Sequence, residues 1–326
     1  MYDAIIVGAG PAGTSAALFG DRLGLKTLLL DKSAFPRDKT CGDALSGKSV
    51  KILDDLDLLE GVNNLDGSII QRIIFANPKH SECELLLDKS LNKQHISHGY
   101  VIPRSIFDNY MFEKAKNVSD AEEGFTVNDL LFEGNRVIGV KGKSVDGSEK
   151  EFRGNLILGA DGPNSIVSKK VGLYQMDMDH TAVGIRCYYE NVKDLTDQIE
   201  LHYVEEINPG YFWIFPSGKN RANIGVGLLK SIVKKESRNL SEIMINIINS
   251  EELKGNFLIN VSIYKFNENN LLVERTEAKQ ANIRDTTWLI EDGYTIQLQD
   301  KNIKNDFENL IFYSTFDREK LNSIYS

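Results

Sequence analysis

The stretch Gly8-Ala9-Gly10-Pro11-Ala12-Gly13 decides the fold of the first part of the chain. The apolar run 4–7 precedes it, residues 14–23 have the composition of a helix, and a second apolar run at 26–30 ends at Asp31. Glycines at this spacing between a strand and a helix, with an acidic residue after the next strand, are typical of a dinucleotide-binding unit. The sequence therefore predicts an α/β fold with a Rossmann-like, doubly wound parallel sheet.

Each glycine of this motif has a physical role in such a unit. Gly8 permits the sharp exit from the strand, Gly10 lets the backbone approach a pyrophosphate, and Gly13 lets the helix lie close to the sheet. The phosphates then face the helix N-terminus, where free N–H groups and the helix dipole stabilise negative charge. Asp31 is placed to accept hydrogen bonds from the hydroxyls of an adenosine ribose.

The bulk composition excludes several classes of function. The chain has 326 residues, 41% of them hydrophobic, and a formal net charge of -9, so it lacks the basic surplus that nucleic acid requires of a partner. No apolar run reaches the roughly 18 residues that span a bilayer. The N-terminus lacks a secretion signal and the three cysteines are widely separated, so we expect a cytoplasmic protein with reduced thiols. His95 and His98 lie in a polar stretch, and we expect no metal site there.

Past residue 125 the pattern changes to short strands separated by turns. Runs at 130–133, 136–143 and 150–153 predict a three-stranded β-meander. The apolar run 156–160 then predicts a buried strand that delivers Asp161-Gly162 to the edge of the sheet where ligands bind. The alternative interpretation is that Asp161-Gly162 forms a plain turn.

A second group of strand-like runs follows at 181–189, 199–204, 211–215 and 222–229 and predicts an antiparallel α+β substrate domain. Alternation along the segment Pro209–Pro216 places its large aromatic residues on one face. These residues are Tyr211, Trp213 and Phe215. Such a face is either plain core or the apolar wall of a pocket for a hydrophobic substrate.

We therefore expect a discontinuous organisation. Residues 1–60 and 100–175 form the dinucleotide-binding domain, residues 61–99 and 176–257 form the substrate domain, and residues 258–326 form a short β-rich tail.

Several motifs, taken in this order, resemble the geranylgeranyl reductase family of FAD-dependent oxidoreductases. They are the glycine motif, the loop from Phe35-Pro36 to Cys41-Gly42-Asp43, Pro103-Arg104, Gly159-Ala160-Asp161-Gly162 and Pro209–Pro216. The resemblance runs from Met1 to about Gly255. It implies FAD as the cofactor, with its isoalloxazine between the two domains. The cofactor-binding residues that it implies are Gly8, Gly10, Pro11, Ala12, Gly13, Asp31, Lys32, Cys41, Gly42, Arg104, Asp161 and Gly162.

The same resemblance implies reduction of isoprenoid double bonds, with Tyr211, Trp213 and Phe215 lining the chain of the substrate. Hydride from reduced flavin reaches one alkene carbon and a proton must reach the other. Cys41 is the candidate catalytic residue for that proton, and a structural thiol is the alternative. The implied partners are an apolar or lipid substrate and an electron donor, NADPH or ferredoxin, with peripheral membrane contact as an option.

The sequence departs from this family in its last part. The family's third flavin motif, Gly-Asp-Ala-Ala-Gly, is absent from the chain. From about Leu258 the residues instead resemble part of the periplasmic β-domain of the lipopolysaccharide-export permease family. We expect a junction near residues 255–262, or else a divergent end of an ordinary reductase. A flavin monooxygenase of the aromatic-hydroxylase type and a catalytically incomplete flavoprotein fragment remain alternative functions.

Overall fold

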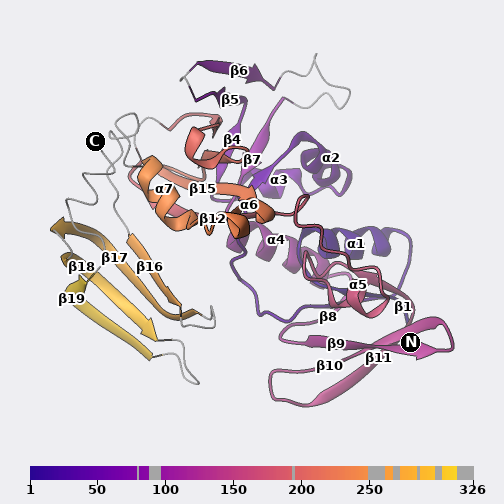
Figure 1. Ribbon diagram of the computed structural model, residues 1–326. Helices are drawn as coiled ribbons and strands as arrows, with labels where there is room; N and C mark the ends of the chain where they lie inside the picture. The colour runs from indigo at the N-terminus through magenta and orange to yellow at the C-terminus, as the bar shows by residue number, and fades with distance from the viewer. Residues whose placement is uncertain are drawn as a thin grey trace. The chain divides into compact units, whose positions relative to one another are not determined.

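The computed structural model describes residues 1–78, 81–87, 97–192, 195–248, 261–266, 272–284, 287–297 and 303–313. The chain divides into two compact units, each assembled from separate segments (Figure 1). The first unit comprises Met1–Gly67 and Asp88–Asp177, and the second comprises Ser68–Leu87 and Met178–Ser326.

The first unit contains a sheet in which parallel strands lie in the order β8-β2-β1-β11. These strands are β1 (Tyr2–Val7), β2 (Thr27–Leu30), β8 (Asp120–Glu122) and β11 (Glu149–Gly159). The helix α1 (Pro11–Arg22) connects β1 to β2 and begins with proline at its first turn, three residues before the expected helix. The predicted α/β fold is confirmed.

The two faces of this sheet are covered differently. The helices α1 and α4 (Arg104–Lys116) lie together on one face, over a core that includes Ile6, Leu29 and Phe112. A meander of β9 (Thr126–Glu133), β10 (Arg136–Lys143) and the first half of β11 covers the other face, whose core includes Ile5, Leu30 and Val140. The predicted β-meander is confirmed. Because β11 continues from the meander into the parallel sheet, it joins the two parts rigidly.

The helices of the first unit correct two details of the sequence prediction. The apolar spacing over residues 50–59 predicts one short helix, but the structure has two, α2 (Gly47–Asp55) and α3 (Leu59–Asn63), because Asp57 between them takes a left-handed backbone conformation. The sequence offers Ser105 as an N-cap for a helix over residues 105–116, but Ser105 does not cap α4. The carbonyl of Pro103 instead accepts the N–H groups of Ile106 and Phe107, so the helix begins at Arg104.

Three short elements complete the first unit. Strand β3 (Ala44–Leu45) pairs antiparallel with β7 (Gly99–Val101), directly before α4. A last short helix, α5 (Ile166–Lys170), follows the turn after β11.

The second unit is built on a sheet with the strand order β12-β15-β14-β13-β5-β6. The strands are β5 (Arg72–Ala76), β6 (Glu82–Leu86), β12 (Ala182–Glu190), β13 (Gln198–His202), β14 (Tyr211–Pro216) and β15 (Arg221–Leu229). All neighbours are antiparallel except β13 and β5. The sequence predicts one strand over 68–76, but the structure divides it into β4 (Ser68–Ile70) and β5. Between them, the N–H of Gln71 donates a hydrogen bond to the carbonyl of Asp197.

One face of this second sheet carries the core of the unit. Phe212, Ile214 and Val226 pack there with Met244 and Ile247 of the helix α7 (Leu240–Ile248), beside α6 (Lys230–Lys235). A one-turn helix, η2 (Glu205–Ile207), precedes β14. The predicted antiparallel α+β region is confirmed.

The C-terminal part forms a separate four-stranded antiparallel sheet, visible in Figure 1 in orange to yellow. Its strands are β16 (Val261–Phe266), β17 (Leu272–Arg284), β18 (Thr287–Gln297) and β19 (Ile303–Tyr313). The predicted β-rich tail is confirmed, but its strands are longer than expected. An Asp-Gly pair is typical of a turn. Asp292 and Gly293 nevertheless lie within β18, where Gly293 pairs with Ala278 of β17 and with Phe307 of β19.

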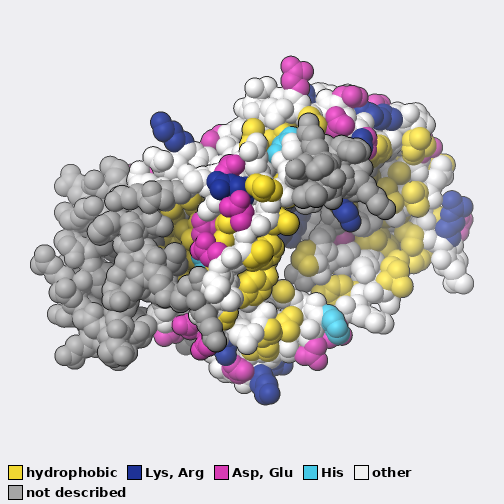
Figure 2. Space-filling view, turned by 90° about the horizontal axis from the view of Figure 1, so that it is seen from above, with side chains coloured by type: hydrophobic (Ala, Val, Ile, Leu, Met, Phe, Trp, Pro, Cys, Tyr) yellow, Lys and Arg dark blue, Asp and Glu magenta, His cyan; other side chains and the backbone are white. Residues whose placement is uncertain are grey.

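The described surface is mixed in character. On the face shown in Figure 2, acidic and basic side chains lie interspersed, and hydrophobic side chains gather in patches between them. Within the described ranges, the helices are all too short or too polar to traverse a bilayer.

Candidate functional site

The glycine motif forms a tight junction between β1, α1 and the end of β11. Gly8 has a φ of 100°, and a Cβ atom there would overlap the carbonyl of Ala160. A Cβ atom on Gly13 would overlap the carbonyl of Gly8. Backbone atoms block both positions, so the turn and the start of α1 require glycine at each of them.

The N-terminus of α1 presents positive charge. Gly10 is the residue that precedes the first helical turn, no side chain caps that turn, and it contains no acidic residue. The space into which a Cβ atom of Gly10 would point is bounded by the guanidinium groups of Arg37 and Arg104, at 3.7 Å and 3.9 Å. A helix dipole and two cations therefore converge on a position without a side chain, an arrangement that favours a bound anion.

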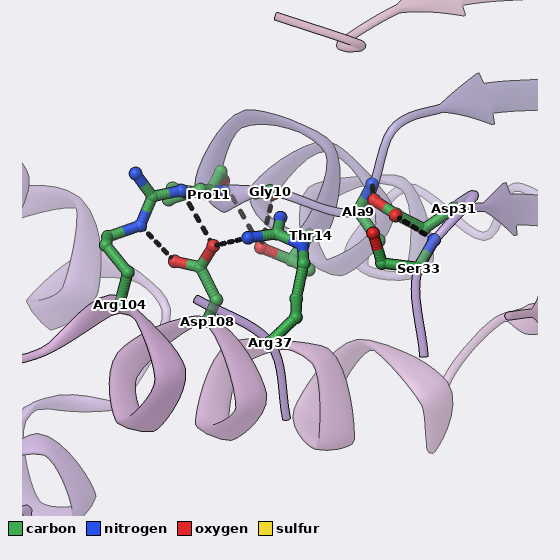
Figure 3. Close-up of polar contacts among 9 residues, drawn as sticks. All are labelled: Ala9, Gly10, Pro11, Thr14, Asp31, Ser33, Arg37, Arg104 and Asp108. Atoms are coloured by element: carbon green, nitrogen blue, oxygen red, sulfur yellow. Dashed lines mark hydrogen bonds and ion pairs between the residues drawn. The ribbon is translucent and has the colours of Figure 1, made fainter. Parts of the chain in front are cut away.

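A buried carboxylate holds the two arginines in place, as Figure 3 shows. Asp108 is fully buried on α4 and accepts hydrogen bonds from Arg104 Nε and Nη2 at 2.6 Å and 2.7 Å. Arg37 Nη1 donates to the same carboxylate at 2.9 Å. Burial lowers the pKa of the Arg104 guanidinium, but the hydrogen bonds and charge of Asp108 outweigh this effect and raise the pKa above its ordinary value. One negative charge between two positive ones leaves a net positive charge facing Gly10.

Arg37 and Asp108 were not among the residues predicted to act at this site. Their one local signal is that Arg104 and Asp108 stand four positions apart, the spacing at which opposite charges pair on a helix. Arg37 follows the Phe35-Pro36 loop, and only the tertiary structure brings it to the helix.

Asp31 stands at the end of β2 and ties the glycine turn to the following loop (Figure 3). Its Oδ2 atom accepts the N–H of Ala9 at 2.7 Å, and its Oδ1 atom accepts the N–H of Ser33 at 2.8 Å. Each carboxylate oxygen keeps a second acceptor site. A contact with a ribose remains a prediction. Lys32, which follows, is exposed.

The second predicted motif reaches the same edge of the sheet. The N–H of Ala160 donates to the carbonyl of Val7 at 2.7 Å, which places Asp161 beside the glycine turn. Asp161 Oδ2 accepts the N–H groups of Ile166 and Val167 and so caps α5. Its Oδ1 atom is buried and has no hydrogen-bond partner among the described residues. Gly162 is exposed, with a φ of 80°.

The cysteine loop lies close to the arginines. Cys41 is half-buried and lies close enough to Arg104 to contribute to the raised pKa of its guanidinium. Gly42 is half-buried beside it. A catalytic role for Cys41 remains a prediction.

The predicted aromatic residues form a continuous row of neighbouring rings in the second unit. The ring centroids of Tyr211 and Trp213 are 5.9 Å apart, and those of Trp213 and Phe215 are 6.1 Å apart. Tyr203 extends the row at 6.1 Å from Tyr211. The core beneath α7 contains the intervening Phe212, whereas the described members of that core include none of the row. The row therefore occupies the opposite face of the sheet.

Comparison with known proteins agrees with this geometry. A family described as an FAD binding domain matches residues 1–250. Digeranylgeranylglycerophospholipid reductase 1 of Methanopyrus kandleri is 32% identical over 237 residues, which cover 70% of this chain and 58% of the relative. The digeranylgeranylglycerophospholipid reductase of Methanosarcina acetivorans is 28% identical over 302 residues, covering 86% of this chain and 70% of the relative. The chain thus spans little more than half of the first relative's length.

A solved structure of similar fold is a triple mutant of the flavin-dependent brominase Bmp2. It has a TM-score of 0.68 at 25% identity and covers 79% of this chain and 64% of its own.

The cofactor of the first unit is FAD, as the matched family indicates. The residues present fit this molecule. The open position at Gly10 between two guanidinium groups suits a diphosphate, the Asp31 carboxylate suits ribose hydroxyls, and the buried Oδ1 atom of Asp161 lacks a partner among the described residues.

We predict that Gly10→Val weakens FAD binding without unfolding the protein. The backbone at Gly10 is extended and its nearest neighbours are at 3.7 Å or more, so valine fits the fold but occupies the approach of the phosphate. Losing one or two charge-assisted hydrogen bonds, each about 1.5–3 kcal/mol, corresponds to a loss of roughly tenfold or more in affinity. Fluorescence titration with FAD measures it. Gly227→Ala, in the second unit, is the control, because Gly227 has no positive φ and its Cβ atom would make only ordinary contacts; unchanged affinity of the Gly10 variant contradicts the assignment.

We also predict that Asp108→Asn strongly destabilises the first unit. The substitution leaves two largely buried arginines without a charged partner, at a cost of about 3–5 kcal/mol in the free energy of unfolding. Asp129→Asn is the control, because its ion pair with Lys170 is 52% exposed at the carboxylate and solvent screening leaves it little effect on stability. Urea denaturation followed by circular dichroism compares them. Equal midpoints for the two variants would refute the structural role of Asp108.

Proposed function

Because the chain belongs to the FAD binding domain family, we propose that it is an FAD-dependent oxidoreductase that reduces carbon–carbon double bonds of an isoprenoid or related apolar chain. The aromatic row of the second unit is the observation that carries the proposal. Large rigid side chains on the sheet face opposite the α7 core, with Tyr211 exposed and Trp213 and Phe215 buried, suit a long apolar ligand. The names of the two relatives support the same substrate class.

The residues of this chain divide the work of such a reaction. Arg37 and Arg104 bind the diphosphate beside Gly10, and the aromatic row orients the alkene and excludes water from it. Reduced FAD, when bound, supplies hydride for one alkene carbon. The other carbon requires a proton, and Cys41 is the residue that we propose to deliver or position it.

The remaining parts of the proposal concern partners and location. An apolar lipid substrate is consistent with a cytoplasmic enzyme that meets its substrate at a membrane surface. The electron donor is NADPH or ferredoxin. The gain of two electrons by the flavin from either donor completes the cycle.

The end of the chain bears on whether the flavin site is complete. The alignment with the Methanosarcina reductase covers 86% of this chain, and it is therefore longer than the family match, which spans residues 1–250. This favours a divergent end of a reductase. The alternative is a junction near residues 255–262 followed by a piece of a lipopolysaccharide-export permease domain, in a flavoprotein fragment without turnover.

A flavin-dependent oxygenase is the second candidate function. The brominase structure matches this fold over 79% of the chain, so the fold is compatible with a flavin that reacts with oxygen. A monooxygenase of the aromatic-hydroxylase type needs the same dinucleotide site and differs in its use of oxygen.

An anaerobic single turnover separates these functions. FAD-loaded protein is reduced with dithionite, which replaces the unknown donor, and is mixed with geranylgeraniol under argon. We expect reoxidation of the flavin together with a product that has gained two hydrogens, measured by absorbance and mass spectrometry. Reoxidation only after oxygen is admitted, with an oxygenated product, would identify a monooxygenase. Protein that retains no FAD would support the incomplete fragment.

Neighbouring residues of β14 provide a matched pair of variants. Trp213→Ala is expected to weaken geranylgeraniol binding more than it lowers stability, because Trp213 lies on the aromatic row. Phe212→Ala removes a core side chain from the opposite face and is expected to cost about 3–5 kcal/mol in stability, with binding to the folded protein retained. Ligand titration and urea denaturation of both variants test this. A Trp213 variant with the behaviour of the Phe212 variant would show that the row is plain core.

A further inference from the structure

Small residues of β15 lie on the same sheet face as the aromatic row. Gly225 pairs with Trp213, Asn223 pairs with Phe215, and Gly227 pairs with Tyr211. On the far side of β15, Gly184 of β12 pairs with Gly227. Three glycines of two adjacent strands, Gly184, Gly225 and Gly227, therefore form a patch without side chains, which we call the glycine patch.

The indole of Trp213 lies over this patch. A Cβ atom on Gly225 would overlap Cζ2 of the indole and lie 2.7 Å from Cη2. A Cβ atom on Gly184 would lie 3.6 Å from Cη2, and one on Gly227 would lie 3.7 Å from Cζ3. Gly225 has no positive φ, so its role is to leave space and not to permit an unusual backbone. The six-membered ring thus rests on backbone, where any side chain at residue 225 would lift it.

A hydrogen bond fixes the other end of the indole. The Nε1–H of Trp213 donates to Oδ1 of Asn223 at 2.9 Å, and Asn223 is fully buried. Trp213 itself is 8% exposed, whereas Tyr211 and Tyr203 are 39% and 41% exposed. The hydrogen bond sets the direction of the ring in its plane and the glycine patch sets its height above the sheet.

We propose that Asn223 and Gly225 are positioning residues that hold Trp213 flat on the sheet, and that this arrangement selects a long, extended apolar chain as the ligand of the aromatic row. The inference rests on the proposed function and deepens it. A flat indole keeps the row level from the exposed Tyr211 to Phe215, which is 8% exposed like Trp213, and we expect consecutive segments of a bound chain to contact the row along this level. A raised indole interrupts the row at its middle, which affects a long ligand more than a short one.

The position of the indole can be observed directly. The chain has two tryptophans, Trp213 and Trp288, so Trp288→Phe protein labelled with 4-fluorotryptophan reports on Trp213 alone. In the FAD-loaded protein we expect one sharp ¹⁹F resonance. Asn223→Leu, which removes the acceptor, and Gly225→Ala, which lifts the ring, should shift or broaden it. Gly227→Ala is the matched control, because its Cβ atom fits in ordinary contact with the ring.

The same variants test the selection of the ligand. For geranylgeraniol, Asn223→Leu and Gly225→Ala should weaken binding by about tenfold or more, the effect of roughly two methylene groups that lose contact. For the ten-carbon geraniol the loss should be smaller, and Gly227→Ala should change neither affinity by more than about threefold. A Cβ atom on Gly225 also overlaps the Ile185 carbonyl, so Asn223→Leu decides the matter if the Gly225 variant does not fold.

The outcomes separate this inference from the proposed function. If the parent protein binds neither alcohol, the proposed substrate class fails, and the selective role of Trp213 with it. If the parent binds geranylgeraniol but Asn223→Leu keeps both the parent ¹⁹F resonance and the parent affinity, the positioning role is refuted while the proposed function stands. A shifted resonance with equal losses for both alcohols would refute the selection of long chains.

Discussion

Three backbone segments meet at Gly8 more closely than any side chain would allow. The exit of β1, the start of α1 and the end of β11 are in direct contact there, because Gly8 and Gly13 have no Cβ atom to separate them. This approach sets the position of the α1 N-terminus relative to Asp31 and Asp161. The positive pole of the helix, the arginines held by Asp108 and the end of the parallel sheet consequently face one another.

The two units differ in the chemical groups that they present. The first unit uses backbone N–H groups, a helix dipole and paired charges, all of which suit a phosphorylated cofactor. The second unit presents a row of aromatic rings on one face of its sheet, and the strand next to Trp213 has glycine in place of side chains beneath the indole. Such a face suits an apolar ligand. Glycine serves both units, as a conformational requirement at Gly8 and as a source of space at Gly225.

Sequence patterns predicted those features that depend on neighbours in the chain. The strand at Tyr2–Val7, the glycine turn and the meander follow from periodicity and turn residues, which are local. The ion pair of Arg37 with Asp108 joins residues far apart in sequence, and nothing local marks it. Gly225 looks like any glycine within a strand until the register with Trp213 is known. The helix start at Arg104 was shifted because the Pro103 carbonyl, and not a side chain, accepts the first N–H groups.

The second unit is assembled from two separate segments of the chain, so the ribosome synthesises its strands at different times. Strands β5 and β6 are synthesised between the two segments of the first unit. Strand β13, which pairs with β5, is synthesised much later. Arg72 forms its ion pair with Asp197, at 2.5 Å, only after residue 197, directly before β13, has been synthesised. Until then one edge of β5 has no partner strand and is open to wrong pairing, although Arg72 already pairs with Glu84 within the hairpin. The nascent chain therefore completes the parallel sheet of the first unit while the β5–β6 hairpin of the second unit still lacks its neighbouring strand β13.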